Sequence, residues 1–527
     1  MRRYWRWLLG CLMIAALLGA AVVFLPWRNG LVAVTGEEAL LPQLRGGVQW
    51  AFNWTRPLPR TADDTPVAHT ELAPFGINTF LNLEVEPEKR ERSLQMISEA
   101  GFRWIRQEFT WEDIEIHGKG DFEDRRHEPY RSAWEKYDQI VDLAEAYDLN
   151  IIARLSNPPA WSRAAGDAGG TYAPPDNFDD YADFVETVVR RYQGRIRYYQ
   201  LWNEPNIYPE WGNQPVDPAA YTRVLCSAYA RVKAVDPEAV VISGALAPTD
   251  QLGTLTSNGS NNLMDSIFLQ RMYDAGAKDC FDVMALNDYM LWSGPCDRRM
   301  RPQVINFSRP QWIRDVMVSN GDAAKPIWLT EMNSNTVPEG LPTNYGRVTE
   351  EQQARYAVQA LERIQREWPW LGMVNVWFFK RPSNLEQDQA WYYFRLVEPD
   401  FTPLPVYSAL KDYLTTLEPT LYRGWHQANT WQATYTGEWQ SAAEDGTGAR
   451  RGLPGAALSL AWEGRALELH TLGGGVIRVR MDDVSTPVDV ALSAEPLTLG
   501  AGLLAERHTL SLTVIEGEFT LTALRVR

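Results

Sequence analysis

The most informative stretch of the chain for its fold reads IRYYQLWNEPN, residues 196–206. Apolar and aromatic residues dominate its first seven positions, which is typical of a short strand covered on both faces. The polar turn Asn203-Glu204-Pro205-Asn206 then ends the strand. Beyond it, residues 221–232 carry apolar side chains at steps of three and four, which indicates a helix. This stretch therefore predicts a strand followed by a covering helix.

The same strand-then-helix unit recurs through the middle of the chain. Strand-like apolar runs lie at 75–81, 102–106, 150–155, 196–202, 239–246, 281–287, 326–330 and 371–379, with helical patterns between them. Eight such units bury parallel strands under helices, and closing the sheet leaves no strand edge exposed. We therefore predict an α/β protein whose residues 73–418 form a (β/α)8 TIM barrel. A doubly wound open sheet is the alternative.

The pattern changes near residue 419. Helical periodicity disappears, and short alternating runs such as 457–462, 466–471 and 509–514 are separated by Gly- and Asp-rich turns. Alternation with a period of two is the pattern of antiparallel strands with one buried face. We predict a C-terminal all-β sandwich domain over residues 419–527.

The N-terminus carries the pattern of a membrane segment. Three arginines precede an uncharged, mostly apolar run from Trp7 to Trp27, about the 20 residues that cross a bilayer as a helix. Positive charge on the short side places that side in the cytoplasm. We predict a cytoplasmic tip and a single-pass transmembrane helix over residues 1–29, a tether over 30–72, and the other domains outside the cell membrane. A cleaved signal peptide ending near Gly19-Ala20-Ala21 is the alternative.

Composition and charge narrow the classes of ligand. The 527 residues are 45% hydrophobic and 22% charged, as in an ordinary folded protein. Lys and Arg number 51 against 67 Asp and Glu, a net charge of −16 that disfavours nucleic acid as a partner. The sequence has no histidine pair with metal-ligand spacing, no nucleophile elbow and no glycine-rich phosphate loop after a strand. We expect no metal and no cofactor.

Four cysteines, Cys11, Cys226, Cys280 and Cys296, bear on the redox state. Cys11 falls in the predicted membrane segment. Cys280 and Cys296 flank a predicted strand that would hold their sulfur atoms too far apart for a bridge. We therefore expect free thiols.

Two glutamates mark the candidate site. Glu204 directly follows the fourth predicted strand, and Glu331 directly follows the seventh. The carboxyl ends of barrel strands meet on one face, where barrel active sites are built. The chain also has 22 Trp and 22 Tyr, whose rings suit ligands with an apolar face and a hydroxylated edge, as sugars have. Paired carboxylates on one face, with many aromatics, indicate glycosidic-bond chemistry.

These motifs resemble the glycoside hydrolases of clan A, and most of all family 39 and bacterial exopolysaccharide hydrolases. The resemblance covers about residues 74–417 and rests on Trp104-Ile105-Arg106, Trp111, Asn157-Pro158-Pro159-Ala160-Trp161 and Leu201-Trp202-Asn203-Glu204-Pro205-Asn206. It implies a retaining enzyme with Glu204 as acid/base and Glu331 as nucleophile. It also implies that the substrate-binding residues are Arg106, Trp111, Asn157, Trp161, Asn203, Tyr289 and Trp377.

The resemblance implies more specific roles for three of these residues. Arg106 would lie beside the nucleophile, Asn203 would bond the sugar 2-hydroxyl, and Trp377 would form the floor of the subsite for the cleaved sugar. One position departs from the clan pattern: Asn287 stands two residues before Tyr289, where the clan often has histidine. The contact expected of that histidine is therefore in question.

Charge arguments agree with this assignment. One carboxyl must be protonated near neutral pH and the other ionised. A guanidinium beside Glu331 would keep Glu331 ionised, while the charge on Glu331 would raise the pKa of Glu204. Glu108, which shares inward parity with Arg106 on the second strand, is expected to pair with Arg106 or to bind a hydroxyl.

The sequence thus predicts a membrane-anchored, outward-facing retaining glycoside hydrolase that acts on polysaccharide or oligosaccharide. A non-catalytic carbohydrate-binding surface protein and a transglycosylase are the alternatives. The sandwich domain has two open roles, packing against the barrel or binding carbohydrate. The second role would use its tryptophans, Trp425, Trp431, Trp439 and Trp462.

Overall fold

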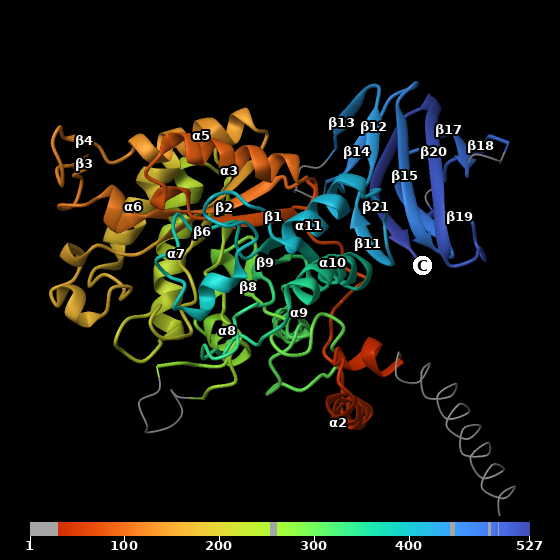
Figure 1. Ribbon diagram of the computed structural model, residues 1–527. Coiled ribbons are helices and arrows are strands. Elements are labelled where there is room, and N and C mark those ends of the chain that lie inside the picture. The colour runs from red at the N-terminus through yellow and green to blue at the C-terminus, as the bar shows by residue number, and fades with distance from the viewer. Residues whose placement is uncertain (1–29, 253–260, 443–447, 483–485, 494) are drawn as a thin grey trace, which may run out of the picture.

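The computed structural model describes residues 30–252, 261–442, 448–482, 486–493 and 495–527, and the predicted barrel is present among them (Figure 1). Its parallel strands are β1 (Phe75–Thr79), β2 (Trp104–Thr110), β5 (Asn150–Ser156), β6 (Tyr198–Leu201), β7 (Val240–Ile242), β8 (Met284–Asn287), β9 (Ile327–Met332) and β10 (Leu371–Val376). They lie in the order β7-β6-β5-β2-β1-β10-β9-β8. Parallel bridges from Ile242 to Val283 and from Leu246 to Leu286 join β7 to β8. The sheet therefore closes, which excludes the open-sheet alternative.

A helix follows each barrel strand. These helices are α3 (Pro87–Glu99), α5 (Glu135–Ala146), α6 (Phe178–Arg191), α7 (Pro218–Val235), α8 (Asp265–Asp274), α9 (Pro310–Ser319), α10 (Glu350–Glu367) and α11 (Pro405–Thr416). Helix α6 shows why they form. The side chain of Asn177 caps its first turn, Arg190 and Arg191 complement the dipole of its last turn, and Tyr181 and Val185 on one face are fully buried.

Large side chains fill the interior of the barrel near the amino ends of its strands. Trp104, Tyr198 and Trp328 pack with ring centroids 4.7–5.7 Å apart. Space for them depends on glycine. A Cβ on Gly372 would lie 2.7 Å from Trp328 Nε1, and one on Gly76 would lie 2.1 Å from Asn375 Oδ1. This packing closes the lower half of the barrel and confines any ligand to the opposite end, where the strands finish.

Shorter elements lie in the connections. Helix α2 (Leu40–Ala51) and the 3-10 turn η1 (Phe52–Thr55) precede the barrel, and α4 (Trp111–Ile114) with the hairpin β3 (Glu123–Asp124) and β4 (Arg131–Ser132) follows β2. The other 3-10 turns within the described residues are η2 (Leu81–Leu83), η3 (Ala160–Ser162), η4 (Gly166–Gly169), η6 (Ala277–Cys280) and η7 (Ala390–Phe394).

Two antiparallel sheets follow the barrel, as predicted for the sandwich. One contains β13 (Trp439–Ser441), β14 (Arg450–Gly452), β21 (Phe519–Val526), β16 (Leu467–Leu472) and β19 (Leu497–Leu499), with β11 (Gly424–Gln427) also paired to β21. The other contains β12 (Thr434–Thr436), β15 (Ala457–Gly464), β20 (Glu506–Gly517), β17 (Gly475–Met481) and β18 (Val488–Ala491). Leu458, Leu469 and Leu512 lie in the shared buried core between them.

The sandwich lies against the side of the barrel near α10 and α11 (Figure 1). Trp431 packs edge-on against Phe75 of β1 at 5.9 Å, and the Trp425 ring lies against the His470 ring of β16, with centroids 4.4 Å apart. Trp462 is fully buried in the sandwich core. These three tryptophans therefore contribute to packing, and they are not an exposed aromatic platform.

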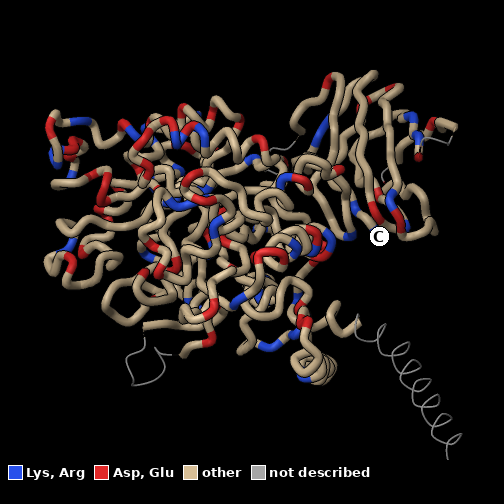
Figure 2. Tube along the Cα trace, viewed as in Figure 1, with Lys and Arg blue, Asp and Glu red and all other residues tan. Residues whose placement is uncertain are grey.

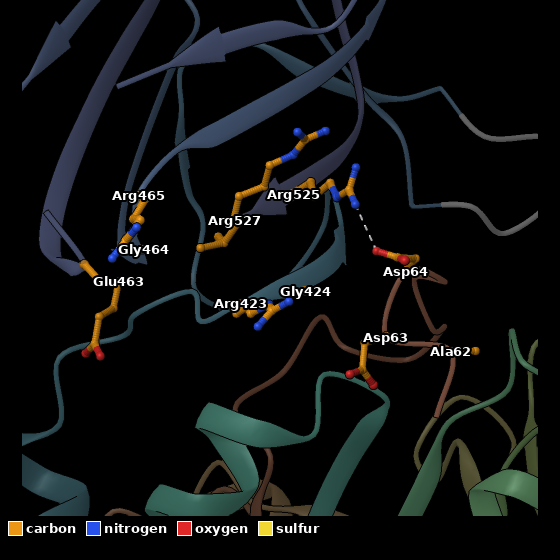
Figure 3. Close-up of a pocket in the computed structure, with 12 residues that line it drawn as sticks. Ala62, Asp63, Asp64, Arg423, Gly424, Glu463, Gly464, Arg465, Arg525 and Arg527 are labelled. Atoms are coloured by element: carbon orange, nitrogen blue, oxygen red, sulfur yellow. Dashed lines mark hydrogen bonds and ion pairs between the residues drawn. The ribbon is translucent and has the colours of Figure 1, made fainter. Parts of the chain in front are cut away.

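A cavity of about 790 Å³ lies at this junction (Figure 3). Side chains of both charges line it, namely Arg423, Arg465, Arg525, Arg527, Asp63, Asp64 and Glu463. Arg525 pairs with Asp64 at 3.0 Å, and Glu463 is held by Arg366 of α10. Figure 2 shows the same mixture over both domains, with Lys and Arg interspersed among Asp and Glu.

Part of the predicted tether is docked on the barrel. Glu37 accepts from Arg299 at 3.1 Å, Glu38 accepts from the Tyr356 hydroxyl at 2.9 Å, and Asn53 Nδ2 donates to the Arg298 carbonyl at 2.8 Å. The predicted membrane segment, Trp7 to Trp27, lies outside the described residues. Among those that are described, no helix combines the length and the apolar character needed to cross a membrane.

The expectation of free thiols is wrong for one pair. Cys226 and Cys280 form a disulfide, with their Cα atoms 4.7 Å apart, while Cys296 is free. Cys226 lies on α7 and Cys280 ends η6, and these two elements pack together although 54 residues separate the cysteines. The distance argument correctly excluded Cys280–Cys296, but the sequence spacing does not reveal the contact between α7 and η6.

Candidate active site

The turn after β6 brings Glu204 to the top of the barrel. Trp202 and Glu204 adopt positive φ angles of 82° and 33°, which non-glycine residues rarely do. Surrounding contacts hold this backbone. The Trp202 amide donates to the Leu155 carbonyl at 3.0 Å, and its indole N–H donates to the Glu210 carbonyl at 2.9 Å. Backbone strain that surrounding contacts hold in place is typical of functional sites.

A register shift in β9 brings Glu331 to the same place. Leu329 pairs with Val374 and Met332 pairs with Val376, so two residues of β9 stand opposite one residue of β10. Trp328 points into the barrel, and strict alternation would turn the residue three positions later outward. The extra residue reverses the parity. Glu331 therefore lies inside the barrel, 4% exposed.

Arg106 of β2 connects these two strand ends. Its Nη1 donates to Glu331 Oε1 at 2.9 Å and to Asn78 Oδ1 at 2.8 Å. Its Nε donates to Gln200 Oε1 at 2.7 Å, and its Nη2 donates to Asn203 Oδ1 at 2.9 Å. The guanidinium is thus fixed by four acceptors on β1, β6, the turn after β6, and β9. A guanidinium fixed by this many acceptors sets a positive charge directly against the Glu331 carboxylate.

Each carboxylate also has a partner from β8 or the residues after it. The Tyr289 hydroxyl donates to Glu331 Oε2, and Asn287 Nδ2 donates to Glu204 Oε1 at 2.7 Å. The Thr330 hydroxyl donates to Asn287 Oδ1 at 2.7 Å, which fixes the orientation of that amide. Asn287, which stands where the clan often has histidine, therefore does have a contact in the site.

The electrostatic environment separates the two glutamates. Burial and then the negative charges of Glu331 and Glu210 together raise the pKa of Glu204 to about 8, against the lowering effects of the Asn287 hydrogen bond and the Arg106 charge. At neutral pH Glu204 thus holds a proton while Glu331 is paired with a guanidinium. One carboxyl can donate a proton and the other can donate an electron pair.

The other predicted substrate-binding residues differ in position. Asn203 is buried beside Arg106, and Tyr289 beside Glu331. Asn157, Trp161 and Trp377 are half-buried in the segments after β5 and β10. The Trp377 ring packs edge-on against Phe80 at 5.5 Å, and the Trp161 indole donates to the Glu115 carbonyl at 2.8 Å.

Trp111 is not placed as predicted. It is fully buried, stacks on Phe184 of α6 with centroids 5.3 Å apart, and donates its indole N–H to Glu115 Oε2 at 2.6 Å. A ring covered in this way belongs to the layer between strands and helices. The family resemblance implied a substrate-binding role for Trp111, but this residue begins the short helix α4 and its side chain is buried.

Glu108 also differs from the expectation, because it pairs with Arg154 of β5 at 2.7 Å and not with Arg106. Its second partner is the Ser156 hydroxyl, at 3.0 Å.

Sequence reasoning missed Glu210 altogether. Burial raises the pKa of Glu210 to about 7, and its side chain hydrogen-bonds with Asn203. Glu210 does not directly follow a predicted strand, so the alternation of inward and outward strand residues gives no indication of its position.

Comparison with known proteins adds the following. No family profile matches the chain. A 6-phospho-beta-glucosidase from Clostridium longisporum is 24% identical over 116 residues, which are 22% of this chain and 23% of that protein. The chain thus matches less than a quarter of the length of this curated relative.

Several solved structures resemble the chain in fold. A family 39 glycoside hydrolase from Bacteroides cellulosilyticus WH2 has a TM-score of 0.48 and 18% identity, with 87% of this chain and 83% of that chain covered. A family 39 β-xylosidase from Caulobacter crescentus has a TM-score of 0.46 and 15% identity, with 87% and 97% covered. An exo-β-1,4-mannosidase from Opitutaceae bacterium strain TAV5 has a TM-score of 0.45 and 15% identity, with 68% and 62% covered.

Proposed function

We propose that this protein is a retaining O-glycoside hydrolase that cleaves polysaccharide or oligosaccharide by double displacement. The observation that carries the proposal is the unequal treatment of two buried carboxyls on one face of a barrel. Arg106 holds Glu331 at 2.9 Å, while burial and the charge of Glu331 raise the pKa of Glu204 to about 8. Glycoside hydrolysis needs this division between a nucleophile and an acid.

In the first step, Glu331 attacks the anomeric carbon and Glu204 protonates the departing glycosidic oxygen. Arg106 and Tyr289 hold the two oxygens of Glu331, so the nucleophile is oriented before substrate arrives. The C–O bond to the leaving sugar breaks as the bond to Glu331 forms. A glycosyl-enzyme ester and an ionised Glu204 result.

In the second step, Glu204 acts as the base. Esterification removes the negative charge of Glu331, so one of the causes that raise the pKa of Glu204 disappears. Asn287 stabilises the ionised form of Glu204 through its hydrogen bond. Glu204 then takes a proton from water as that water attacks the anomeric carbon. Two inversions give net retention.

We also propose that the enzyme is anchored in the cell membrane through residues 1–29 and that its barrel faces outward. Two observations support this location. Three arginines precede the apolar run from Trp7 to Trp27. The Cys226–Cys280 disulfide is typical of proteins in an oxidising, extracytoplasmic compartment.

Hydrolysis of a panel of β-xylosides, β-glucosides, β-mannosides and bacterial exopolysaccharides tests the function. We expect the wild-type protein to cleave at least one member and Glu331→Ala to cleave none. Proton NMR of the first product should show the anomeric configuration of the substrate. An inverted first product, or equal activity of wild type and Glu331→Ala, would exclude this mechanism. Net transfer to an added sugar, without hydrolysis, would instead identify a transglycosylase.

A further inference from the structure

Tyr345 lies beside the candidate catalytic pair but has no role in the two steps above. It belongs to the loop between β9 and α10. Its ring centroid is 5.5 Å from that of Phe394 and 6.5 Å from that of Tyr289, whose hydroxyl contacts Glu331. The Tyr345 side of this aromatic cluster is open, because Tyr345 is 36% exposed whereas Phe394 is buried. Tyr345 therefore stands between the buried pair and solvent.

Contacts within the protein hold this loop in place. The Tyr345 amide donates to the Thr343 hydroxyl at 3.0 Å. The next residue, Gly346, has a φ of 77° and touches the loop after β8 so closely that a Cβ would lie 2.1 Å from the Leu291 carbonyl oxygen. The backbone on both sides of Tyr345 is therefore fixed without a ligand. A ring fixed in advance loses little freedom when it binds.

The phenol hydroxyl of Tyr345 has no hydrogen-bond partner within the described part of the chain, whereas the Tyr289 hydroxyl is taken by Glu331. Burial and then the charges of Glu204 and Glu331 raise the pKa of Tyr345, so the phenol keeps its proton. A protonated hydroxyl beside two carboxyls, without a protein acceptor, is available to donate to a bound sugar.

The position of Tyr345 indicates which sugar it would meet. Arg106, Tyr289 and Glu331 are at least nine-tenths buried, so a sugar bonded to Glu331 would lie deeper in the barrel than Tyr345, which is 36% exposed. The remaining substrate must extend from Glu204, which protonates the leaving oxygen, toward the opening.

We propose that Tyr345 binds the sugar on the leaving-group side of the scissile bond, with its hydroxyl donating to a hydroxyl of that sugar. This inference rests on the proposed hydrolase function and adds a specificity residue to it. It predicts that Tyr345 matters only when a sugar occupies the leaving-group position.

Two substrates with the same cleaved sugar distinguish binding of the leaving-group sugar by Tyr345 from an effect of Tyr345 on the cleaved sugar or the glutamates. One is the oligosaccharide that the wild type cleaves, and the other is the corresponding glycosyl fluoride, whose leaving group is a single small atom. We expect Tyr345→Phe to lower kcat/KM about 10-fold on the oligosaccharide, mainly through KM, and Tyr345→Ala to lower it further. Both variants should stay within about 2-fold of wild type on the fluoride.

Tyr147→Phe is the matched control. Its hydroxyl donates to Glu91 at 3.2 Å, and it follows α5 at the opposite end of the barrel. It should behave as wild type on both substrates. Equal losses on oligosaccharide and fluoride would overturn the proposal, because Tyr345 would then act on the cleaved sugar or on the glutamates. Unchanged kinetics of both Tyr345 variants would overturn it as well. A wild-type protein that cleaves no glycoside would instead refute the proposed function itself.

Discussion

The side-chain amide of Asn287 donates a hydrogen bond to Glu204 Oε1 at 2.7 Å. An amide N–H stabilises the ionised carboxylate more than the protonated acid, so this contact lowers the pKa of Glu204 against the larger effect of burial. The contact thus favours the base that the second step requires. Thr330, the residue before the proposed nucleophile, holds the same amide in place from its other end.

Asn287→Ala should therefore raise the pKa of Glu204 above about 8 and slow deglycosylation. Loss of a hydrogen bond to a charged group is worth about 1.5–3 kcal/mol, roughly a 10- to 100-fold loss in the second step. The pH dependence of kcat/KM should show its alkaline limb at higher pH than in wild type. Asn287→His, which restores a nitrogen donor, should recover part of the rate. An alkaline limb that moves to lower pH would contradict this role.

Substitution of Glu331 and substitution of Glu204 should change turnover in different ways. Glu331→Ala should lower turnover of every substrate by on the order of 10⁴-fold or more, because no other group is placed to attack. Glu204→Ala should keep the first step for substrates with good leaving groups but stall in the second. Azide, a nucleophile that needs no base, should restore its turnover and yield a glycosyl azide with the configuration of the substrate. Azide rescue of Glu331→Ala with retained configuration, and of Glu204→Ala with inverted configuration, would show that the roles are exchanged.

The proton affinity of Glu204 should depend on the charge of Glu331. In wild type we expect kcat/KM to fall as pH rises through about 8, because the first step needs the protonated acid. Glu331→Gln removes a negative charge, so the pKa of Glu204 should fall although burial still keeps it above its usual range. Carbon-13 NMR of labelled glutamate can follow this titration. An unchanged Glu204 titration in Glu331→Gln would show that the two carboxyls do not interact.

Loss of the Cys226–Cys280 disulfide should destabilise the barrel. The bridge closes a loop across a sequence separation of 54 residues, for which chain entropy predicts about 4 kcal/mol and measured cases range from about 0 to 5. Urea unfolding of Cys226→Ser/Cys280→Ser should show a lower midpoint than wild type, and a reductant should bring wild type close to the variant. Cys296→Ser, which removes a free thiol, should unfold like wild type. Equal midpoints for all three proteins would refute a stabilising role.

The barrel could be predicted from the sequence because its signals are local. Each strand is a short apolar run, and each helix carries its own period of three to four residues, as residues 196–206 and 221–232 illustrate. Glu204 and Glu331 could be found for the same reason, since each adjoins such a run. The contact between Arg106 and Glu331 is expected only from the family resemblance, and the structure shows it.

The other features of the site depend on contacts between residues that are far apart in the sequence, and no local sequence pattern indicates these contacts. Glu108 pairs with Arg154 because β2 and β5 are neighbours in register, and the sequence alone left Arg106 as the nearer candidate. Trp111 is buried because α6 supplies Phe184 for it to stack on. Tyr345 lies in a loop well beyond its strand, so only the folded chain shows that its ring lies beside Tyr289.

The register shift in β9 makes the proposed activity sensitive to the length of one strand. Insertion of a single residue between Val374 and Val376 of the neighbouring strand β10 would let β9 pair without the shift, restore regular alternation and turn the Glu331 carboxylate toward the helices. A relative could then keep every motif quoted above, including Asn-Glu-Pro and the glutamate of the seventh strand, and still be inert. For such proteins, gaps in an alignment at β10 would be more informative than the identity of the aligned residues.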